Sequence, residues 1–494
     1  MKSFKEIIDF LLNHDLIIEY SNIDLYIEHI TYDSRDAKRG TLFFCKGVHF
    51  RKEYLLDAIE SEALAYISET DYEVGIPKII VKDIRKAMAL LASFFYDYPD
   101  KKLKIIGVTG TKGKSTTVEF IKSIFDEYLL ENNKKPMGIF SSIKIYDGIE
   151  EKSSKLTTPE ALVLFEHLHN AVKSGIEYVV MEVSSQALKY DRVSELSLDV
   201  ACFLNIGRDH ISPNEHSDFE DYFKSKLKII RLAENMIYNK DMEMVEIVED
   251  EIKNLSKKNY SYSIKNKNAD LFSIKNEYIG DRNTFTVDKS NYELNIFGEY
   301  NVENALCAIA VARHYNIEEK YIIRGLKAVK LVGRSNLFIT KDKKIVFLVD
   351  YAHNDLSFKK VYNAILNTFT GYKIFSVFGA SGEKALNRIE DLSTISVGYS
   401  DRIFLAPDDP GYVEISKIQQ EMLQYIDTDN IPTKRFDSRE EAILAAYGEV
   451  KEKTVIFIAG KGEEEYQYIN GDYVKIKSDL EVVKELWSQY NHDL

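Results

Sequence analysis

The 494-residue chain has little cysteine, proline or tryptophan. It contains three cysteines, eight prolines and one tryptophan. The cysteines, Cys45, Cys202 and Cys307, lie far apart and lack the spacing of a metal site, which predicts buried thiols in a reducing compartment. The few prolines, together with the lack of any serine- and glycine-rich stretch, predict short linkers.

Long apolar runs are missing as well. No segment reaches the roughly 18 apolar residues that a membrane-spanning helix needs. Residues 1–20 carry acidic and basic side chains throughout and lack the apolar core and cleavage site of a signal peptide. The sequence therefore predicts a cytoplasmic protein that does not enter a membrane.

Positive charge is in short supply. The 65 Lys and Arg residues face 79 Asp and Glu residues, which gives a net charge of −14. Phosphate backbones require basic surfaces, so this balance argues against a nucleic-acid partner, and an acidic ligand must meet local positive sites. The content of 45% hydrophobic and 29% charged residues is typical of a globular protein. The length predicts about three domains.

The most informative segment that is present spans residues 107–116, with the sequence Gly-Val-Thr-Gly-Thr-Lys-Gly-Lys-Ser-Thr. A strand-like apolar stretch precedes it at 103–108, and a helical pattern follows at 117–130. This order forms a phosphate cradle, because loop N–H groups and the helix N-terminus face the anion, Lys114 neutralises charge and the Ser115 hydroxyl can hold Mg²⁺. We therefore predict a nucleoside triphosphate site at Gly110, Thr111, Lys112, Gly113, Lys114, Ser115 and Thr116.

The pattern along the chain predicts three α/β domains, at 1–100, 101–331 and 332–494. The first alternates short strands and helices up to Tyr98-Pro99, where proline stops a helix. The second has antiparallel segments at 267–300 and buried parallel strands at 105–108, 178–183, 200–204 and 236–238. The third is a second doubly wound unit with strands at 345–349, 373–378, 402–405 and 454–458.

Candidate metal ligands follow the strands of the second block, at the edge where the carboxyl ends of parallel strands meet. Glu182 is either a carboxylate ligand for Mg²⁺ or a solvated loop acid. His210 is either a metal ligand or a residue of a capped turn. Lys226, in the helical stretch 219–230, is by itself a surface lysine. Thr158 and Pro159 predict a helix start, with Thr158 as the N-cap.

The tight phosphate loop, Gly-Thr-x-Gly-Lys-Ser with Val108 where the general loop needs glycine, resembles that of the Mur ligase family, which makes amide bonds with ATP. Further short motifs follow in the family's order and cover nearly the whole chain. They are Asp33-Ser34-Arg35, Thr157-Thr158-Pro159, Glu182-Val183-Ser184-Ser185, Arg192, Asp209-His210, Lys226, Asn301-x-x-Asn304, Gly333-Arg334, Asp350-Tyr351-Ala352-His353 and Gly460-Lys461-Gly462.

The resemblance implies a three-domain α/β architecture. A small N-terminal α/β domain would bind UDP, a central P-loop ATPase-like domain with a mostly parallel sheet would bind ATP, and a C-terminal Rossmann-like domain would bind an amino acid. In the ATP site, Asn304 would meet the adenine, and closure of the third domain would add Arg334 and Asp350.

The resemblance also implies the catalytic and metal residues, which are Lys114, Lys226 and His210 for catalysis and Ser115, Glu182, His210 and Lys226 for two Mg²⁺ ions. Lys226 would be carbamylated by CO₂. Carbamylation turns a positive ammonium into a negative carboxylate, so that the side chain supports a metal ion instead of repelling it.

By the same resemblance, the acceptor would be UDP-N-acetylmuramoyl-L-alanyl-D-glutamate, bound by Ser34, Thr157, Thr158, Ser184 and Arg192. ATP would phosphorylate its terminal carboxylate, and the amine of a free diamino acid would attack the acyl phosphate. Closure of the third domain would keep water from this intermediate. A monomer is expected.

The added amino acid would be read by Asp408, Asp409, Pro410, Gly411 and Glu464. Family members that add meso-diaminopimelate carry Asp-Asn-Pro-Arg in this loop, where the arginine holds the extra carboxylate. This motif has no cation, and its acids suit a side chain that ends in an ammonium, which favours L-lysine. The sequence leaves ornithine and meso-diaminopimelate open.

Four departures from the family pattern stand out. Gly411 replaces the asparagine of lysine-adding relatives, Ser335-Asn336 follows Gly333-Arg334, Gln186 stands where many relatives have histidine, and Gly382-Glu383-Lys384 is atypical. They leave open a paralogue with altered activity. A folylpolyglutamate-type ligase would lack the Asp33-Ser34-Arg35 module, and a P-loop switch protein would lack the third domain.

Overall fold

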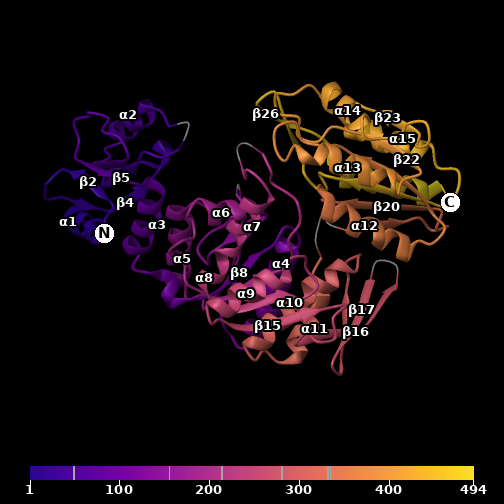
Figure 1. Ribbon diagram of the computed structural model, residues 1–494, viewed down its shortest axis with the longest axis horizontal. Coiled ribbons are helices and arrows are strands. Elements are labelled where there is room, and N and C mark those ends of the chain that lie inside the picture. The colour runs from indigo at the N-terminus through magenta and orange to yellow at the C-terminus, as the bar shows by residue number, and fades with distance from the viewer. Residues whose placement is uncertain are drawn as a thin grey trace.

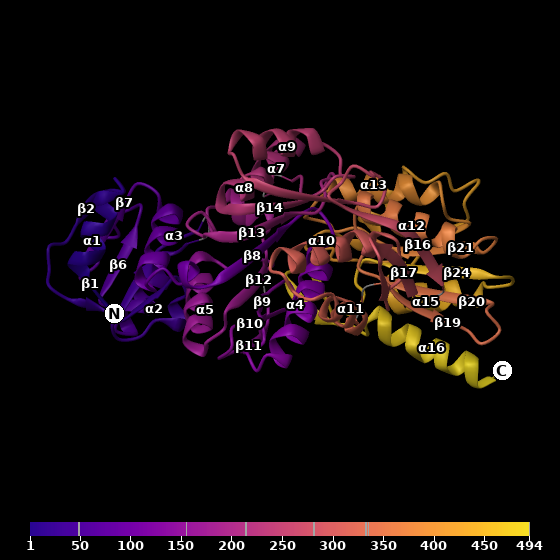
Figure 2. The same ribbon diagram turned by 90° about the horizontal axis from the view of Figure 1, so that it is seen from below.

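The computed structural model describes residues 1–47, 50–154, 156–212, 215–279, 282–330, 333 and 335–493. Three α/β units follow one another along the chain, and Figure 2 shows them in a row from the N-terminus to the C-terminus (Figures 1 and 2). This confirms the predicted three-domain α/β class. Among these residues, no helix is long and apolar enough to cross a membrane. The predicted boundary at 331 and 332 lies outside the described residues.

The N-terminal unit is built on a five-stranded sheet in the order β2 (Ile17–Tyr20), β7 (Lys78–Val81), β6 (Ala65–Ser68), β5 (Thr41–Phe44) and β4 (His29–Thr31). Phe43 and Phe44 of β5 point to opposite faces and enter different cores, which is why this inner strand is apolar throughout. The remaining elements are β1 (Lys2–Ser3), β3 (Tyr26–Ile27), α1 (Phe4–Asn13), η1 (Ser34–Asp36), α2 (Lys52–Glu60), α3 (Ile84–Phe95) and η2 (Pro99–Lys102).

The central unit contains an eleven-stranded sheet whose middle strands are parallel. Its order is β11 (Glu151–Ser153), β10 (Lys144–Tyr146), β9 (Gly138–Phe140), β12 (Tyr178–Glu182), β8 (Lys104–Thr109), β13 (Leu198–Phe203), β14 (Ala233–Asn239), β15 (Lys258–Ser263), β16 (Leu271–Ile279), β17 (Arg282–Val287) and β18 (Ser290–Leu294). The strands from β16 to β18 are antiparallel to one another, as the sequence predicted. Consecutive residues of β8, Ile105 and Ile106, enter cores on opposite faces.

Helices cover both faces of the central sheet. One face carries α4 (Lys114–Glu131), α10 (Tyr300–His314) and α11 (Glu319–Ala328). The other carries α5 (Ala161–Ser174), α6 (Ser185–Lys189), α7 (Phe219–Leu227), α8 (Ile229–Leu232) and α9 (Val245–Asn254). The apolar core of this second face continues into the N-terminal unit through α3 and α5, so the two units share one core. All three cysteines are free and buried, as predicted.

The C-terminal unit has a six-stranded sheet in the order β19 (Asn336–Ile339), β20 (Ile345–Asp350), β24 (Thr454–Ala459), β21 (Lys373–Phe378), β22 (Arg402–Leu405) and β23 (Thr433–Arg435). Only β19 is antiparallel to its neighbour. Helices α12 (Asp355–Thr368), α13 (Asn387–Val397), α14 (Ile415–Leu423), α15 (Arg439–Gly448) and α16 (Asp479–Asp493) accompany the sheet, and β25 (Tyr466–Ile469) and β26 (Asp472–Lys475) form a separate hairpin.

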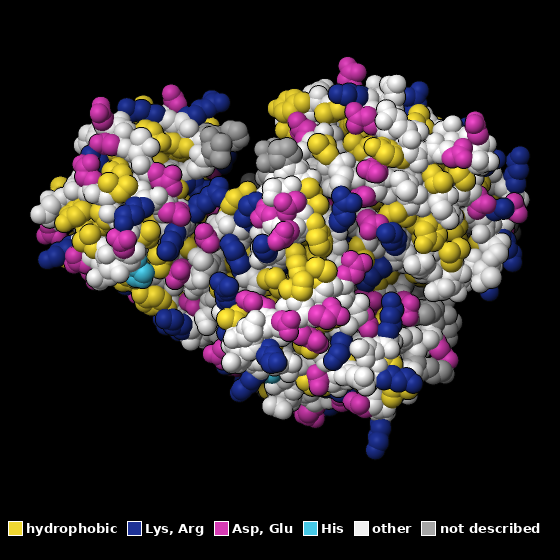
Figure 3. Space-filling view, in the orientation of Figure 1, with side chains coloured by type: hydrophobic (Ala, Val, Ile, Leu, Met, Phe, Trp, Pro, Cys, Tyr) yellow, Lys and Arg dark blue, Asp and Glu magenta, His cyan; other side chains and the backbone are white. Residues whose placement is uncertain are grey.

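The face shown in Figure 3 mixes basic and acidic side chains without a large field of one sign, and it is hollowed between the N-terminal and C-terminal units. In the central sheet, β8 lies between β12 and β13, where the strand order reverses. Ligands bind at such switch points in open α/β sheets. The glycine loop after β8 opens there.

Candidate functional site

The loop between β8 and α4 has the backbone shape that its glycines allow. Gly113 has a φ of +87°, and a Cβ at this position would lie 2.3 Å from Asn304 Oδ1. The loop is anchored to the segment after β13, because the backbone N–H of Lys112 donates to Asn205 Oδ1 over 2.8 Å. The loop therefore stands against α10 on one side and β13 on the other, with the N-terminus of α4 behind it.

Two lysine side chains converge on one carbonyl of this loop. Lys114 Nζ lies 2.9 Å and Lys226 Nζ 3.0 Å from the oxygen of Gly110. Lys226 is 1% exposed and so is not the surface lysine that its helical pattern suggested. Burial, together with repulsion from Lys114 and Lys112, lowers the pKa of Lys226 well below its usual range. Its neutral amine is the form that reacts with CO₂.

Oxygen atoms that could act as metal ligands lie beside Ser115. Its hydroxyl lies 3.1 Å from that of Ser142, which in turn contacts Glu182 Oε1 over 3.1 Å. The backbone N–H of Ser142 also donates to Glu182 Oε1, over 2.9 Å. Ser115 and Glu182 are both buried, so Glu182 is not a solvated loop acid. Hydroxyl and carboxylate oxygens are ligands that Mg²⁺ prefers, and this donor set fits that ion.

His210 and Ser142 differ from the sequence-based expectation at this edge of the sheet. His210 has a φ of +55° and its Nδ1 lies 2.8 Å from Glu215 Oε1, so one ring nitrogen is engaged in a loop contact. No described contact joins it to Ser115 or Glu182. Ser142 belongs to no motif and follows the short strand β9, which is why the sequence did not identify it.

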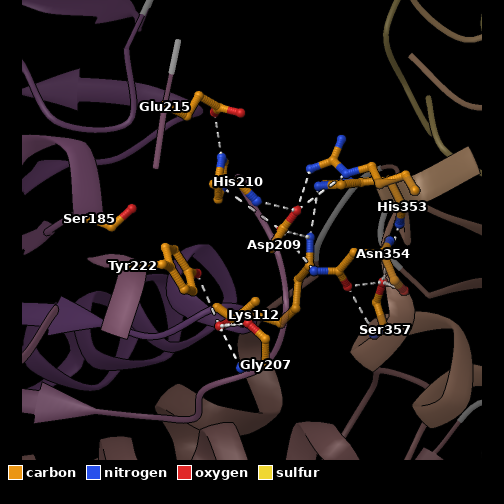
Figure 4. A network of polar contacts seen from close by, with 12 residues as sticks. Lys112, Ser185, Gly207, Asp209, His210, Glu215, Tyr222, His353, Asn354 and Ser357 are labelled. Atoms are coloured by element: carbon orange, nitrogen blue, oxygen red, sulfur yellow. Dashed lines mark hydrogen bonds and ion pairs between the residues drawn. The ribbon is translucent and has the colours of Figure 1, made fainter. Parts of the chain in front are cut away.

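Asp209 joins the central unit to the C-terminal unit (Figure 4). Its side chain is fully buried and accepts from Arg388 Nη2 over 2.9 Å and from Asn354 Nδ2 over 2.7 Å. Burial alone would raise its pKa, yet the Arg388 guanidinium, with His210 and Lys112, holds the pKa of Asp209 well below its usual range. The ionised carboxylate therefore ties the segment after β13 to α12 and α13.

His353 and Lys112 form a second link in this network. Lys112 Nζ lies 2.7 Å from His353 Nε2 and 3.6 Å from Asp209 Oδ2. Burial, with the positive charges of Lys112 and Arg388, lowers the pKa of His353 well below its usual range, so the ring is neutral. The other ring nitrogen, Nδ1, lies 2.7 Å from the Tyr351 carbonyl and donates to it, which leaves Nε2 to accept from the Lys112 ammonium.

A pocket opens between α4, α10 and the loop after β20. Among the residues that line it are five with a predicted ATP role, namely Lys112, Gly113, Thr116, Asn304 and Asp350. Asp350 Oδ2 accepts from the backbone N–H of Ser335 over 2.7 Å, which fixes the segment that enters the C-terminal unit. Arg334, also predicted for ATP, lies outside the described residues.

The helix start predicted at Thr158 is wrong. Helix α5 begins at Ala161 with Glu160 as its N-cap residue. The Thr158 hydroxyl instead donates to the Glu182 carbonyl over 3.0 Å and accepts from the backbone N–H of Ser184 over 3.0 Å. Two predicted precursor residues, Thr158 and Ser184, are thus held together at the end of β12.

A partly buried ion cluster lies between the N-terminal and central units. Arg192 Nη2 pairs with Glu160 Oε1 over 2.8 Å, and Lys46 Nζ pairs with Glu160 Oε2. The Lys46 ammonium also lies 4.9 Å from the ring centre of Tyr32, two residues before Ser34. Burial, opposed by Glu160 and reinforced by Arg192 and Arg85, lowers the pKa of Lys46. The sequence did not identify Lys46, which follows β5 outside any motif.

The loop 408–411 is more neutral than its sequence indicates. Lys461, which is 2% exposed, donates from Nζ to Asp409 Oδ1 over 2.9 Å and also pairs with Glu464. Burial raises the pKa of Asp408, against the opposing charge of Lys461. The motif itself holds no cation, but Lys461 from the loop after β24 partly neutralises it.

Glycine-loop geometry at a switch point, with oxygen donors beside it and a second α/β unit closing the pocket, defines a P-loop nucleotide-binding enzyme. Family models match residues 108–312 as the Mur ligase middle domain and residues 333–462 as the Mur ligase glutamate ligase domain. The chain belongs to the Mur ligase family, whose members are ATP-dependent amide ligases.

Individual relatives match over nearly the whole chain. The chain is 37% identical over 487 residues, 97% of its length and 96% of the relative's, to UDP-N-acetylmuramoyl-L-alanyl-D-glutamate--L-lysine ligase of Streptococcus pneumoniae serotype 4. A solved UDP-N-acetylmuramoyl-L-alanyl-D-glutamate--2,6-diaminopimelate ligase superposes with a TM-score of 0.64 at 23% identity, covering 99% of this chain and 100% of the other. The MurF ligase of Thermotoga maritima in complex with ADP gives 0.64 at 17% identity, covering 94% and 98%. These two structures support the fold.

Proposed function

We propose that this chain is a ligase that adds L-lysine to UDP-N-acetylmuramoyl-L-alanyl-D-glutamate with consumption of ATP. The observation that carries the proposal is the 37% identity, over nearly the full length of both chains, to the pneumococcal protein named for that reaction. In this proposal residues 1–100 bind the UDP moiety, 101–331 bind ATP and 332–494 bind the amino acid. The enzyme works as a cytoplasmic monomer.

ATP occupies the pocket beside the phosphate loop. Gly110, Thr111, Lys112, Gly113 and Thr116 line the phosphates, Asn304 meets the adenine, and Arg334 and Asp350 complete the site. Ser115, Glu182, His210 and carbamylated Lys226 would hold two Mg²⁺ ions, which would offset the charge of the transferring phosphoryl group. Lys114 neutralises the same charge from the protein side.

The precursor lies along Ser34, Thr157, Thr158, Ser184 and Arg192. Its terminal carboxylate attacks the γ-phosphorus of ATP, which breaks the bond to the bridging oxygen and releases ADP. The amine of lysine then attacks the carbonyl of the acyl phosphate, loses a proton and expels phosphate. The Asp209 contacts hold the C-terminal unit over this site and keep water from the acyl phosphate.

The added amino acid is held at Asp408, Asp409, Pro410, Gly411 and Glu464. The acids of this set exceed the single charge of Lys461, which favours a side chain that ends in an ammonium over one that ends in a carboxylate. L-ornithine and meso-diaminopimelate are the competing substrates to be tested.

Phosphate release tests the proposal. Purified protein is given ATP, Mg²⁺ and the UDP-linked dipeptide precursor, with L-lysine, L-ornithine, meso-diaminopimelate or no amino acid. We expect release that requires both the precursor and lysine. Release that ignores the precursor contradicts the ligase assignment, and release with another amino acid changes only the added substrate.

The Glu160 cluster gives a separate prediction about the precursor. Glu160 neutralises Arg192 and Lys46 when no precursor is bound, so it competes with any anionic group that these cations meet. Glu160→Gln should lower the dissociation constant of the precursor by about threefold, as expected when the two ion pairs that compete for these cations are each weak. Calorimetric titration without ATP measures this effect.

The matched control is Glu177→Gln. Glu177 is an exposed acid that follows the C-terminal end of α5 and pairs with Lys134. Weaker binding by Glu160→Gln would show that the acid instead orients Arg192 for the precursor.

A further inference from the structure

Two departures from the family pattern, Gly411 and Glu383, lie against each other in the C-terminal unit. Gly411 has a φ of +63°. A Cβ at this position would lie 2.1 Å from Glu383 Oε2 and 2.5 Å from Glu383 Cδ. A side chain at 411 and the Glu383 carboxylate therefore exclude each other, and the glycine leaves the space that the carboxylate fills.

The loop that carries Glu383 is locked onto the 408–411 loop. The backbone N–H of Gly382 donates to the Asp409 carbonyl over 3.1 Å. A Cβ at Gly382 would lie 2.2 Å from the Pro410 carbonyl oxygen, so only glycine permits this approach. The backbone next to Glu383 is thus fixed against the loop, which places the Glu383 side chain within reach of Gly411.

The β25–β26 hairpin fixes the other side of Gly411. The backbone N–H of Gly411 donates to the Tyr468 carbonyl over 2.9 Å, and the Gly411 carbonyl accepts from the backbone N–H of Asn470 over 2.7 Å. The backbone N–H of Tyr468 in turn donates to Asp409 Oδ1 over 3.0 Å. A hydrogen bond with Tyr412 raises the pKa of Tyr468, and the nearby negative charge of Glu383 adds to that effect. Glu383 and Asp409 therefore flank the same hairpin strand.

Three largely buried cations of this region pair with other acids. Lys461 pairs with Asp409 and Glu464, Arg388 with Asp209, and Arg439 with Asp479. Within the described part of the chain, no ion pair involves Glu383. Glu383 is exposed, so its carboxylate remains available to a positively charged ligand.

We propose that Glu383 takes the place of the side chain at position 411 and determines which amino acid the enzyme accepts. Its carboxylate receives the side-chain ammonium of a diamino acid such as L-lysine and repels a second carboxylate such as that of meso-diaminopimelate. The proposal rests on the proposed function, because it assigns a specificity residue to the amino-acid site of that reaction.

Glu383→Gln tests the charge while keeping the size of the side chain. We expect the KM for lysine to rise about tenfold, the effect of losing one hydrogen bond to a charged group. The KM values for ATP and the precursor should not change, and the ratio of kcat/KM for lysine to that for meso-diaminopimelate should fall. Glu414→Gln is the matched control. Glu414 is an exposed acid in the connection between β22 and α14, which contains the 408–411 loop, and its side chain makes no capping hydrogen bond.

Gly411→Asn tests the steric part of the proposal. Asparagine tolerates a positive φ, so the backbone keeps its shape while the new side chain displaces Glu383. In this background Glu383→Gln should cause little further change in the ratio, because the Glu383 carboxylate no longer lies over position 411. An active wild type whose amino-acid ratio is unaltered by Glu383→Gln overturns the role of Glu383 alone. A wild type that releases no phosphate with any amino acid overturns the proposed function and this inference together.

Discussion

Lys114→Ala is expected to lower kcat by about 10²- to 10³-fold, the cost of removing one preorganised donor from a developing charge. Lys114 is the first residue of α4, and its ammonium lies over the phosphate loop, 2.9 Å from the Gly110 carbonyl. The same ammonium would neutralise charge on the phosphoryl group as it leaves ATP. Steady-state phosphate release with saturating lysine and precursor measures the loss.

Two controls separate this effect from damage to the helix. Lys122→Ala removes a lysine from the same helix, where it pairs with Asp126, and should leave kcat near the wild-type value. The melting temperature of Lys114→Ala should stay close to that of the wild type. Near-normal turnover by a folded Lys114→Ala protein contradicts the assigned role.

Lys226→Ala is expected to abolish turnover under the same conditions, with partial recovery when a short carboxylate such as acetate is added. The side chain is buried, and its depressed pKa favours the neutral amine, which attacks the carbon of CO₂. The carbamate would supply a negative oxygen to the metal site, and an added carboxylate can enter the cavity that alanine leaves. Labelled bicarbonate, followed by carbon NMR of the wild type, should give a carbamate signal that the variant lacks.

Lys224→Ala is the matched control for Lys226, because Lys224 lies on the same helix and pairs with Glu220 at the surface. It should keep both the activity and the carbamate signal. Full activity of Lys226→Ala, or activity of the wild type in buffer freed of CO₂ that equals the activity in air, contradicts the carbamate.

Local patterns predicted much of the fold. The glycine loop at 107–116 and the apolar runs at 178–183, 345–349 and 454–458 each depend on neighbours in sequence, and all of these runs form strands where expected. The sequence did not predict two edge strands. β19 is half-buried along its whole length and so lacks a clear apolar face, and β23 has only three residues. Thr158 misled the prediction because a threonine hydroxyl suits both an N-cap and a link between strand ends.

The site depends on contacts that a single sequence does not encode locally. Asp209 and Arg388 are 179 positions apart, and a helical arginine gives no sign of its partner. The sequence identified Lys461 as part of the motif Gly460-Lys461-Gly462 but not its partner. Its pairing with Asp409 arises only when the loops after β22 and β24 meet. Gly411 and Glu383 stood out separately as departures, and their steric relation emerged only from the structure.

The measurement that tests the central claim most directly follows the oxygen atoms of the precursor. The terminal carboxylate of the UDP-linked dipeptide is labelled with heavy oxygen and incubated with the protein, ATP, Mg²⁺ and L-lysine. An acyl-phosphate ligase must transfer one labelled oxygen to the released phosphate while the precursor gains the mass of one lysine residue. Unlabelled phosphate, or label transfer without a mass gain in the presence of lysine, would contradict the account.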